Sequence, residues 1–473
     1  MNLSYAQLNH QEHADLSVDM LLHEARENCD TKFVILDDDP TGVQTIHDLY
    51  VYTDCEVTTL IDAFEDGNPG FFLLTNSRAF TQEETIAYHK KLTENVSLAA
   101  KATGKSYLYV SRGDSTLRGH YPLEPQILKE GLEKDGVIID GEILYPFFLE
   151  GGRFTVDDVH YVKNGDVLIP AAQTEFALDK TFGYTHSDLK EYIEEKTEGQ
   201  TKSTDVLSVP LDLLHNGKID EISKLLLHAE KGQKIVVNSI DYFDVKVFCI
   251  ALYKALKAGK HFVFRTAASF VKGLLDVSDR PYLSRSEMIQ EDSENGGVIV
   301  VGSHTQKTTR QLENLLTLEN TVGIAFRSSS ILEGEEVFYD EVRRCVRLEE
   351  EIIRQGKNAV CYTERVLLQQ AGDSKEEALL RSVKISDGVM HLVKDLNVTP
   401  AFVVAKGGIT SSDVGVKALN VKKALVLGQI LPGIPVWKTG EESRFPGIPY
   451  VIFPGNVGEA ESLKEVVNIL TDK

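Results

Sequence analysis

Cysteine is scarce in this sequence, and its spacing excludes two kinds of stabilising element. The chain has five cysteines and no C-x-x-C pair; they are Cys29, Cys55, Cys249, Cys345 and Cys361. Zinc–thiolate sites and disulfide frameworks both need cysteines in closer or regular spacing. Neither a zinc site nor a disulfide framework is therefore indicated, and a reducing compartment fits the composition.

A long apolar run is also missing. No stretch of the chain is apolar over the length that crosses a bilayer. The first thirty residues carry acidic and imidazole side chains where a secretory signal would have its apolar core. We therefore predict a cytoplasmic protein with no membrane partner.

Basic residues are too few to balance the acidic ones. The chain has 50 Lys and Arg against 72 Asp and Glu, which gives a formal net charge of −22. That charge repels a phosphate backbone, and no basic stripe with interleaved aromatics opposes it, so we exclude nucleic acid as a partner. A few arginines in one cleft can still bind a small anion, whatever the total charge.

Short apolar runs alternate with helical segments along the whole chain. At 473 residues the chain is too long for one typical domain. Strands that alternate with helices predict an α/β protein with mostly parallel sheets and helices on both faces. The runs that we predict to be strands are 33–36, 70–75, 106–110, 136–139, 234–237 and 261–264, then 297–301, 321–326, 401–405, 423–427 and 449–453.

A polar, acidic stretch over 276–297 separates the two halves. We therefore predict two α/β domains, 31–285 and 286–473, with the active site in the cleft between them. An acidic, helical N-terminal extension, 1–30, precedes them. Long helices are predicted over 339–355 and 375–393.

Three carboxylates follow the first predicted strand. They are Asp37, Asp38 and Asp39, and Pro40-Thr41-Gly42 comes next. Ligands of open α/β sheets collect at the carboxyl ends of the strands, and such a cluster can hold Mg²⁺ or accept a proton from a hydroxyl group. An acidic turn that solvates the strand end is the alternative. Adjacent carboxylates repel one another and need compensation, which favours a functional role.

Two further strand ends lead into polar groups. After 70–75 come Asn76, Ser77 and Arg78, where the guanidinium could bind a carboxylate with two parallel hydrogen bonds; a helix cap beside a surface arginine explains this triplet equally well. After 106–110 comes the densest set, in which two guanidinium groups, a carboxylate and two hydroxyls suit an anionic polyol. That set is Arg112, Gly113, Asp114, Ser115, Thr116, Leu117, Arg118, Gly119 and His120.

Glycine and hydroxyl residues begin two predicted helices of the second half. Gly302 and Ser303 follow one strand, and Lys406 to Thr410 follow another. Free N–H groups at a helix start bind phosphate, although capping alone explains either loop, so the repetition is what suggests a ligand. The last predicted strand leads into Gly455 to Gly458, where glycines would let the backbone approach a nucleotide; a plain turn is the alternative. Neither a P-loop nor the protein-kinase signature set occurs.

Taken together, these motifs resemble those of the four-carbon acid sugar kinase family, from about residue 33 to the C-terminus. The matching segments are Asp38 to Gly42, Ser77-Arg78, Asp114-Ser115-Thr116-Leu117-Arg118-Gly119, which is the most specific, Tyr145-Pro146, Gly152 to Thr155, Gly302-Ser303, Gly407 to Thr410 and Gly455 to Gly458. The resemblance implies an ATP-dependent kinase that phosphorylates a hydroxyl of a short sugar acid such as threonate, erythronate or a keto-tetronate. It implies that 31–285 binds the sugar acid and 286–473 the nucleotide.

The resemblance also implies the cofactors ATP and Mg²⁺ and a set of site residues. Its metal ligands are not identified, and a homodimer is compatible with it. The implied sugar-acid contacts are Asn76, Ser77, Arg78, Arg112, Gly113, Asp114, Ser115, Thr116 and Arg118. The implied ATP contacts are Ser303, Lys406, Gly407, Gly408, Ile409, Thr410, Gly455 and Asn456. Asp38 or Asp39 would be the base, with Asp114 as the rival.

Two segments depart from the family pattern. Arg112-Gly113 replaces a Lys-Ile pair, and Phe453-Pro454 replaces a Lys-Ser pair before the last glycine loop. A lost lysine could weaken ATP binding, and Lys406 is one candidate for the compensating charge.

Two other functions stay open at this point. Asp37, Asp39 and Thr41 also spell the D-x-D-x-T nucleophile loop of haloacid-dehalogenase-type phosphatases, in which Asp37 would form an aspartyl phosphate. Thr75 could serve that chemistry, but its lysine and its later acidic pair have no convincing match. A non-catalytic sensor of a sugar acid or nucleotide is the third reading.

Overall fold

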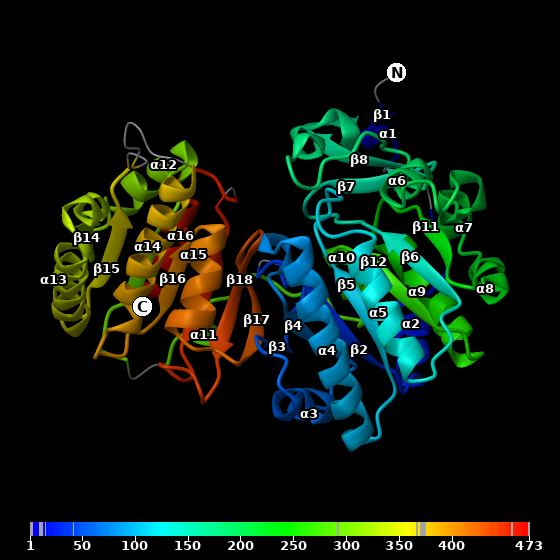
Figure 1. Ribbon diagram of the computed structural model, residues 1–473, viewed down its shortest axis with the longest axis horizontal. Coiled ribbons are helices and arrows are strands. Elements are labelled where there is room, and N and C mark those ends of the chain that lie inside the picture. The colour runs from blue at the N-terminus through cyan, green and yellow to red at the C-terminus, as the bar shows by residue number, and fades with distance from the viewer. Residues whose placement is uncertain are drawn as a thin grey trace. The chain divides into compact units, whose positions relative to one another are not determined.

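The computed structural model describes residues 3–8, 13–14, 16–40, 42–290, 293–365, 368, 375–455 and 457–471. The chain forms two compact units, residues 1–45 with 54–279 (unit 1) and residues 46–53 with 280–473 (unit 2). Both are α/β domains with mostly parallel sheets, as the alternation of strands and helices predicts (Figure 1). No helix of the described ranges is long and apolar enough to span a bilayer.

In unit 1 the strands of the main sheet lie parallel in the order β10-β11-β6-β12-β5-β2-β4. Its elements are β1 (Leu3–Ser4), α1 (Tyr5–Leu8), α2 (Val18–Glu27), β2 (Lys32–Asp37), α3 (Val57–Glu65), β4 (Gly70–Leu74), η1 (Ser77–Ala79), α4 (Gln82–Thr103), β5 (Tyr107–Arg112), α5 (Leu123–Lys134), β6 (Gly141–Tyr145), β7 (Arg153–Val156), β8 (Val159–Asn164), β9 (Val167–Pro170), η2 (Ala171–Gln173), η3 (Glu175–Leu178), α6 (Leu189–Lys196), η4 (Ser203–Asp205), β10 (Leu207–Val209), α7 (Leu211–His215), α8 (Ile219–His228), β11 (Gln233–Val237), α9 (Tyr242–Lys257), β12 (Phe262–Thr266) and α10 (Ala268–Leu274).

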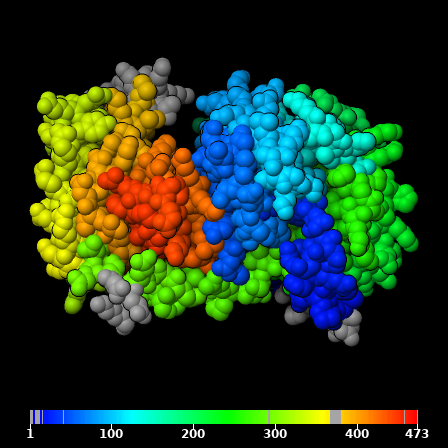
Figure 2. All heavy atoms as spheres, turned by 90° about the horizontal axis from the view of Figure 1, so that it is seen from below, coloured from blue at the N-terminus to red at the C-terminus, as the bar shows by residue number. Residues whose placement is uncertain are grey.

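Burial on both faces explains why the central strands of unit 1 are continuous apolar runs. Every residue of β2, β4 and β5 is buried, as in a parallel sheet with helices on both faces. Helices α3, α4 and α5 pack side by side, and α2, α7, α8 and α10 pack on α9. Figure 2 shows a dark blue segment at the surface beside green segments, and α2 packs there on α9.

One predicted strand of unit 1 is wrong. Residues 136–139 form no strand, and β6 begins at Gly141 instead. Ile138 is 76% exposed, whereas Ile143 and Leu144 are buried in the sheet. The apolar pair at 138–139 lies in the link after α5, so the predicted strand starts five residues before the observed one.

Unit 2 contains a mixed sheet in the order β3-β17-β18-β19-β16-β13-β15-β14. Its strands β19, β16, β13, β15 and β14 are parallel, and β3, β17 and β18 are antiparallel to their neighbours. The elements are β3 (Leu49–Tyr52), α11 (Arg285–Met288), β13 (Val298–Val301), α12 (Gln306–Leu315), β14 (Thr321–Phe326), η5 (Ser328–Glu333), α13 (Glu335–Arg354), β15 (Asn358–Thr363), α14 (Lys375–Lys394), β16 (Val403–Lys406), α15 (Gly408–Asp413), the π-helical turn η6 (Val414–Ala418), β17 (Lys423–Leu431), β18 (Ile434–Thr439), β19 (Pro449–Phe453) and α16 (Ser462–Thr471).

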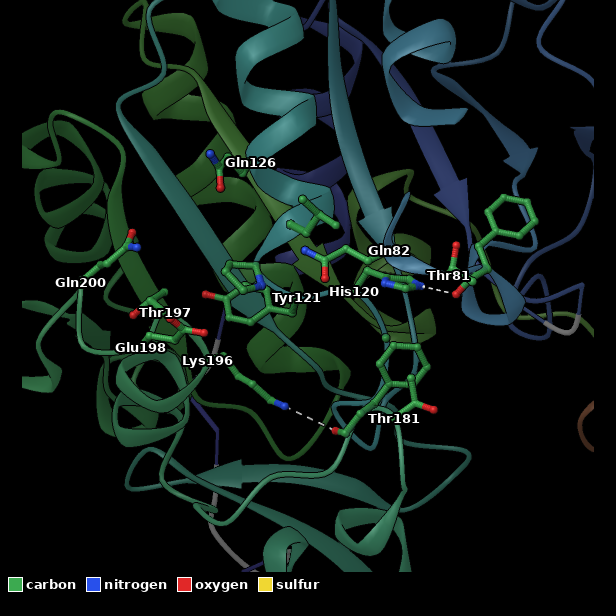
Figure 3. Close-up of a pocket in the computed structure, with 15 residues that line it drawn as sticks. Thr81, Gln82, His120, Tyr121, Gln126, Thr181, Lys196, Thr197, Glu198 and Gln200 are labelled. Carbon is green, nitrogen blue, oxygen red and sulfur yellow. Dashed lines mark hydrogen bonds between the residues drawn. The ribbon is translucent and has the colours of Figure 1, made fainter. Parts of the chain in front are cut away.

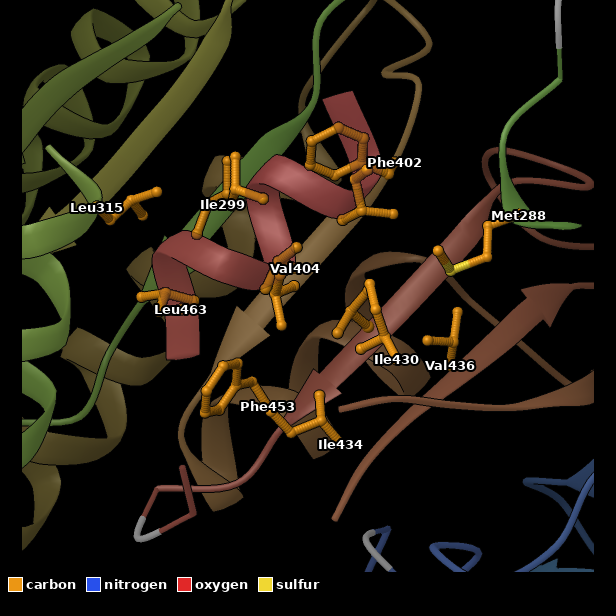
Figure 4. Packing of buried hydrophobic residues seen from close by; sticks show 14 of the residues in the cluster. Met288, Ile299, Leu315, Phe402, Val404, Ile430, Ile434, Val436, Phe453 and Leu463 are labelled. Atoms are coloured by element: carbon orange, nitrogen blue, oxygen red, sulfur yellow. The ribbon is translucent and has the colours of Figure 1, made fainter. Parts of the chain in front are cut away.

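The core of unit 2 holds the strands that carry the glycine loops. Ile299 of β13, Val404 of β16 and Phe453 of β19 pack against Leu463 of α16 in one buried cluster (Figure 4). Because the three strands are parallel neighbours, their carboxyl ends lie at one edge of the sheet. The loops after β13, β16 and β19 therefore start side by side.

Candidate active site

Three loops of unit 1 meet because their strands are parallel neighbours. Asp37, the last residue of β2, lies opposite Leu74 of β4 on one side and Arg112 of β5 on the other. The polar segments that follow these strands therefore emerge at the same edge of the sheet. The structure brings together the three sets of residues that the sequence singled out there.

Two arginines compensate the three aspartates at this edge. Arg78 binds Asp38 with two hydrogen bonds, Nε to Oδ2 at 3.1 Å and Nη2 to Oδ1 at 2.6 Å, and its Nη1 lies 3.3 Å from Asp39 Oδ2. Arg112 Nη1 donates to Asp37 Oδ1 at 3.0 Å. Such a paired network differs from a solvated acidic turn, because each carboxylate has a guanidinium partner within the fold.

Burial separates the electrostatic behaviour of Asp37 from that of its neighbours. Complete burial raises the pKa of Asp37 to about 7; Arg112 opposes this shift, and the charges of Asp38 and Asp39 add to it. The pKa of Arg78 lies well above its usual range, because the attraction of Asp38 and Asp39 outweighs the effect of burial. The site therefore holds a permanent cation beside a carboxyl group that titrates near neutral pH.

The loop after β5 is organised around Asp114. Arg118 Nε donates to Asp114 Oδ2 at 2.9 Å, and the hydroxyl of Thr116 donates to the same oxygen. Burial favours the neutral acid, but Arg78 and Arg118 outweigh burial and hold the pKa of Asp114 well below its usual range. Asp114 therefore stays ionised and orients the guanidinium of Arg118.

Distant side chains fix the backbone of this loop, and sequence reasoning missed them. The hydroxyls of Tyr184 and Tyr192 donate to the carbonyl oxygens of Thr116 and Leu117, both at 2.9 Å. Arg265 Nη2 donates to the carbonyl oxygen of Arg118 at 2.8 Å. Buried tyrosines with bonded hydroxyls are visible only in three dimensions, since neither their spacing nor their neighbours mark them.

Gly113 is required by the same arrangement. A Cβ atom at this position would overlap the guanidinium of Arg265. Gly113 therefore lets Arg265 reach past the start of the loop to the carbonyl oxygen of Arg118.

The other predicted sugar-acid contacts lie at different depths. Ser77 is fully buried and donates to Glu124 Oε2 at 3.3 Å, and Ser111 donates to Glu124 Oε1 at 2.6 Å. Asn76 has left-handed backbone geometry, with φ 54°, and is half-buried, as is Ser115. Ser77 therefore bonds to the buried Glu124 beneath these strand ends, and Glu124 is another residue that the sequence did not reveal.

A cavity of about 460 Å³ opens at the far end of the loop that follows β5 (Figure 3). Gly119 and His120 line one part of it, and Lys196 and Gln200 line another. His120 Nε2 lies 3.1 Å from the carbonyl oxygen of Phe80. Neither the aspartates after β2 nor Arg78 line this cavity, so we place the site at the charged strand ends rather than in the cavity.

In unit 2 the predicted glycine loops converge. A Cβ built on Gly455 would lie 3.8 Å from the backbone nitrogen of Gly408 and 3.9 Å from Ser303 Oγ. Gly407 has φ 132°, and a Cβ there would lie 3.1 Å from Thr410 Oγ1. Backbone from three loops can therefore approach one ligand closely, which suits phosphate or a nucleotide. Ile409 is 75% exposed beside them, and Asn456 and Thr41 lie outside the described residues.

Lys406 occupies a different place from that of a phosphate contact. It is fully buried, and its Nζ donates to the carbonyl oxygens of Pro454 at 2.7 Å and Gly455 at 3.3 Å. Burial, with a smaller effect of Lys307, lowers the pKa of Lys406 to about 7. Lys406 therefore holds the last glycine loop in place.

Arg365 is the cation that sequence reasoning missed in unit 2. Its Nη2 donates to the carbonyl oxygen of Ser303 at 2.6 Å and to Thr309 Oγ1 at 3.0 Å. Its Nη1 is buried and has no hydrogen-bond partner within the described part of the chain. Arg365 follows β15, outside every glycine loop, so no local motif marks it.

Two family models match successive parts of the chain. Residues 33–274 match a family model described as a sugar-binding N-terminal domain, and residues 298–463 match one described as a nucleotide-binding C-terminal domain. No curated protein matches the chain.

Several solved structures match the chain, and the first two described here share its fold. A Salmonella typhimurium LT2 protein, provisionally described as a tRNA synthase, is 16% identical with a TM-score of 0.68, over 92% of this chain and 98% of its own. A Haemophilus influenzae protein of the family model DUF1537 is 16% identical with a TM-score of 0.66, over 92% and 100%. A Bordetella bronchiseptica protein of that family, described with bound citrate as a domain-swapped dimer, is 19% identical with a TM-score of 0.38, over 93% and 99%. The two domain models together cover most of the chain, which belongs to the four-carbon acid sugar kinase family.

Proposed function

We propose that this protein transfers the γ-phosphoryl group of ATP to a hydroxyl of a four-carbon sugar acid such as threonate, erythronate or a keto-tetronate. The observation that carries the proposal is the guanidinium–carboxylate network at one edge of the unit 1 sheet. Phosphoryl transfer needs an anionic acceptor held in position, charge neutralisation on the phosphate and a proton acceptor near the attacking oxygen. The residues of the two units can supply each of these.

Arg78 and Arg118 are the sugar-acid contacts that the geometry favours. Their side chains are 24% and 27% exposed, whereas Arg112 is 7% exposed and engaged with Asp37. A guanidinium has five donors, so each exposed arginine can bind a substrate carboxylate or hydroxyl and keep its aspartate partner. Arg112 then acts by holding Asp37.

Asp39 is the preferred base among the candidate carboxylates. Its side chain is 26% exposed, while Asp38 is 6% exposed and bound at both oxygens by Arg78. Asp114 is a poor proton acceptor because its arginine partners hold its pKa low. Asp38 and Asp114 would thus position the two arginines, and Asp39 would accept the hydroxyl proton.

On the nucleotide side we assign the phosphates to the loops at Ser303, Gly407-Gly408 and Gly455. Arg365 would supply the charge that the family pattern places on a lysine before the last loop, because its Nη1 is directed to no protein acceptor in the described residues. Mg²⁺ would neutralise the phosphates when it is bound with ATP.

The burial of Asp37 disfavours the phosphatase alternative. A nucleophilic aspartate needs an open path to phosphorus. The Asp37 side chain is 2% exposed, Arg112 binds one of its oxygens, and a Cβ on Gly42 would overlap the carboxylate. The glycine loops of unit 2 also have no place in that chemistry.

The deciding experiment is ADP release from Mg·ATP with a panel of threonates, erythronates, keto-tetronates and glycerate. We expect turnover with at least one acid and little without an acceptor, and a loss of that turnover in Arg118→Ala but not in Arg343→Ala, an arginine 57% exposed on α13. ATP binding without turnover on any acid would favour the sensor. Phosphate release from sugar phosphates that beryllofluoride inhibits would favour the phosphatase.

A further inference from the structure

A cluster of His13, His215 and Asp241 lies in unit 1, outside the loops of the candidate active site. One ring nitrogen from each histidine and one carboxylate oxygen lie within 4.8 Å of one another. His215 ends α7, Asp241 is the N-cap of α9, and His13 comes from the segment before α2. The described ranges contain this one group of three or more His, Cys, Asp or Glu side chains that lie close enough to share a metal ion.

His215 is oriented as metal-binding histidines are. Its Nδ1 lies 2.5 Å from Asp244 Oδ1, and the other oxygen of Asp244 accepts the N–H of Ile240 at 2.9 Å. His215 is 5% exposed, and its Nε2 has no hydrogen-bond partner in the part of the chain that the structure describes. A carboxylate on one ring nitrogen fixes the tautomer and leaves the other nitrogen for a metal.

The other two side chains are held beside this nitrogen. Asp241 Oδ1 accepts the N–H of Asp244 at 3.1 Å, so its Oδ2 faces His13 Nε2 at 2.7 Å. The His13 ring stacks on Phe243 with centroids 4.3 Å apart. The backbone N–H of the residue after His13 donates to the carbonyl oxygen of His215 at 3.1 Å, which keeps the segment against α7.

We propose that His13, His215 and Asp241 bind a divalent metal ion, Zn²⁺, with water in the fourth position. Zinc takes imidazole nitrogen and carboxylate oxygen at about 2.1 Å in a tetrahedron, which sets the ligand atoms about 3.4 Å apart. Small movements of the side chains reach that spacing from the observed one. Hydrogen bonds alone leave the buried Nε2 without a partner, which is a cost that the metal removes.

The metal would join the N-terminal segment to α7 and α9. Each ligand comes from a different one of these three, so binding crosslinks the segment to unit 1 and favours the folded state. This role is independent of the proposed kinase reaction. The cysteine spacing argued against a zinc site in the sequence, but the proposed ligand set contains no sulfur, so cysteine could not reveal it.

The test is zinc binding by the full-length protein after chelator treatment and dialysis. Isothermal titration with zinc sulfate should give one tight site per chain, and cobalt chloride should give the visible absorption of a tetrahedral site. His13→Ala and His215→Gln should each abolish the site, and Asp244→Asn should weaken it about 10- to 100-fold.

The matched control is His23→Ala, a histidine 65% exposed in α2 that pairs with Asp276. The control should bind zinc as the wild type does. His13 is more exposed than His215, so His13→Ala separates lost binding from lost folding, which circular dichroism checks. Absence of zinc binding in the wild type, or equal binding by the wild type and a folded His13→Ala protein, would overturn the proposal.

Discussion

The two loop sets of this protein present different chemical groups at their strand ends. The strand ends of unit 1 present charged side chains locked in pairs, such as Arg78 with Asp38 and Arg118 with Asp114. The strand ends of unit 2 present backbone, with glycines at 407, 408 and 455 and a lysine buried beneath them. The contrast suits a small acid that must be identified by its functional groups and a phosphate chain that needs only N–H donors and space.

The largest effect should come from removal of the proposed base in unit 1. In Asp39→Asn the amide cannot accept the proton, so kcat for the sugar acid should fall about 10²- to 10⁴-fold. The Kd for ATP should stay unchanged if the two loop sets act separately. Steady-state kinetics and ATP titration measure the two quantities, with Asp340→Asn as the exposed control. An unchanged kcat would remove Asp39 from the mechanism.

The titration of Asp37 tests whether burial raises the pKa of this carboxyl group among the charged strand ends of unit 1. Its pKa is raised to about 7 in the folded protein, so the stability that its proton contributes is complete below pH 3.8 and is lost as the pH rises through about 7. The free energy of unfolding of the wild type relative to Asp37→Asn should therefore fall by about 1.4 kcal/mol per pH unit between pH 4 and 7. Denaturant unfolding at several pH values measures this difference.

A flat difference over that range would contradict the assignment. It would mean that Arg112 keeps Asp37 ionised in the folded protein, since the pair at 3.0 Å is the main opposing effect.

The sequence predicted these two regions with unequal success, for physical reasons. Strand ends are local features, so the alternation of strands and helices was enough to single out the segments at 37–39, 76–78 and 112–118. The structure then shows that these segments follow neighbouring strands. The residues that hold them, such as Tyr184, Tyr192 and Arg265, come from later segments and carry no local signal. Likewise β3 pairs with β17, more than 350 residues away, in a register that no local pattern encodes.

Charge was the least reliable guide in unit 2. The sequence offered Lys406 as one candidate for the compensating charge at the phosphates, and in the structure its amino group donates to the carbonyl oxygens of Pro454 and Gly455. Arg365, which follows β15, donates instead to the carbonyl oxygen of Ser303 in the loop after β13. Which groups each cation contacts depends on where the fold directs its side chain, and no local pattern encodes that direction.

The substitution Arg118→Lys should have an effect of intermediate size on the side-chain recognition proposed for unit 1. Lysine keeps the charge but cannot bind Asp114 and a substrate oxygen with one planar group, so KM for the acid should rise about 10- to 100-fold with a smaller change in kcat. Arg343→Lys is the matched control, since Arg343 lies exposed on α13. Equal KM values in both variants would show that the charge alone is recognised at this position.

The smallest effect should come from the backbone loops of unit 2. Gly407 has φ 132°, and a Cβ there would press against Thr410 and Ser303. Gly407→Ala should therefore strain the loop and weaken ATP binding about 10-fold, which is about 1.4 kcal/mol. Gly334→Ala is the matched control, because Gly334 has φ 126° with nothing within 4 Å of its Cβ position. Both variants should lose stability, but only Gly407→Ala should lose ATP affinity. If Gly334→Ala weakens ATP binding as much, the loss reflects general strain in unit 2 rather than contact between this backbone and the nucleotide.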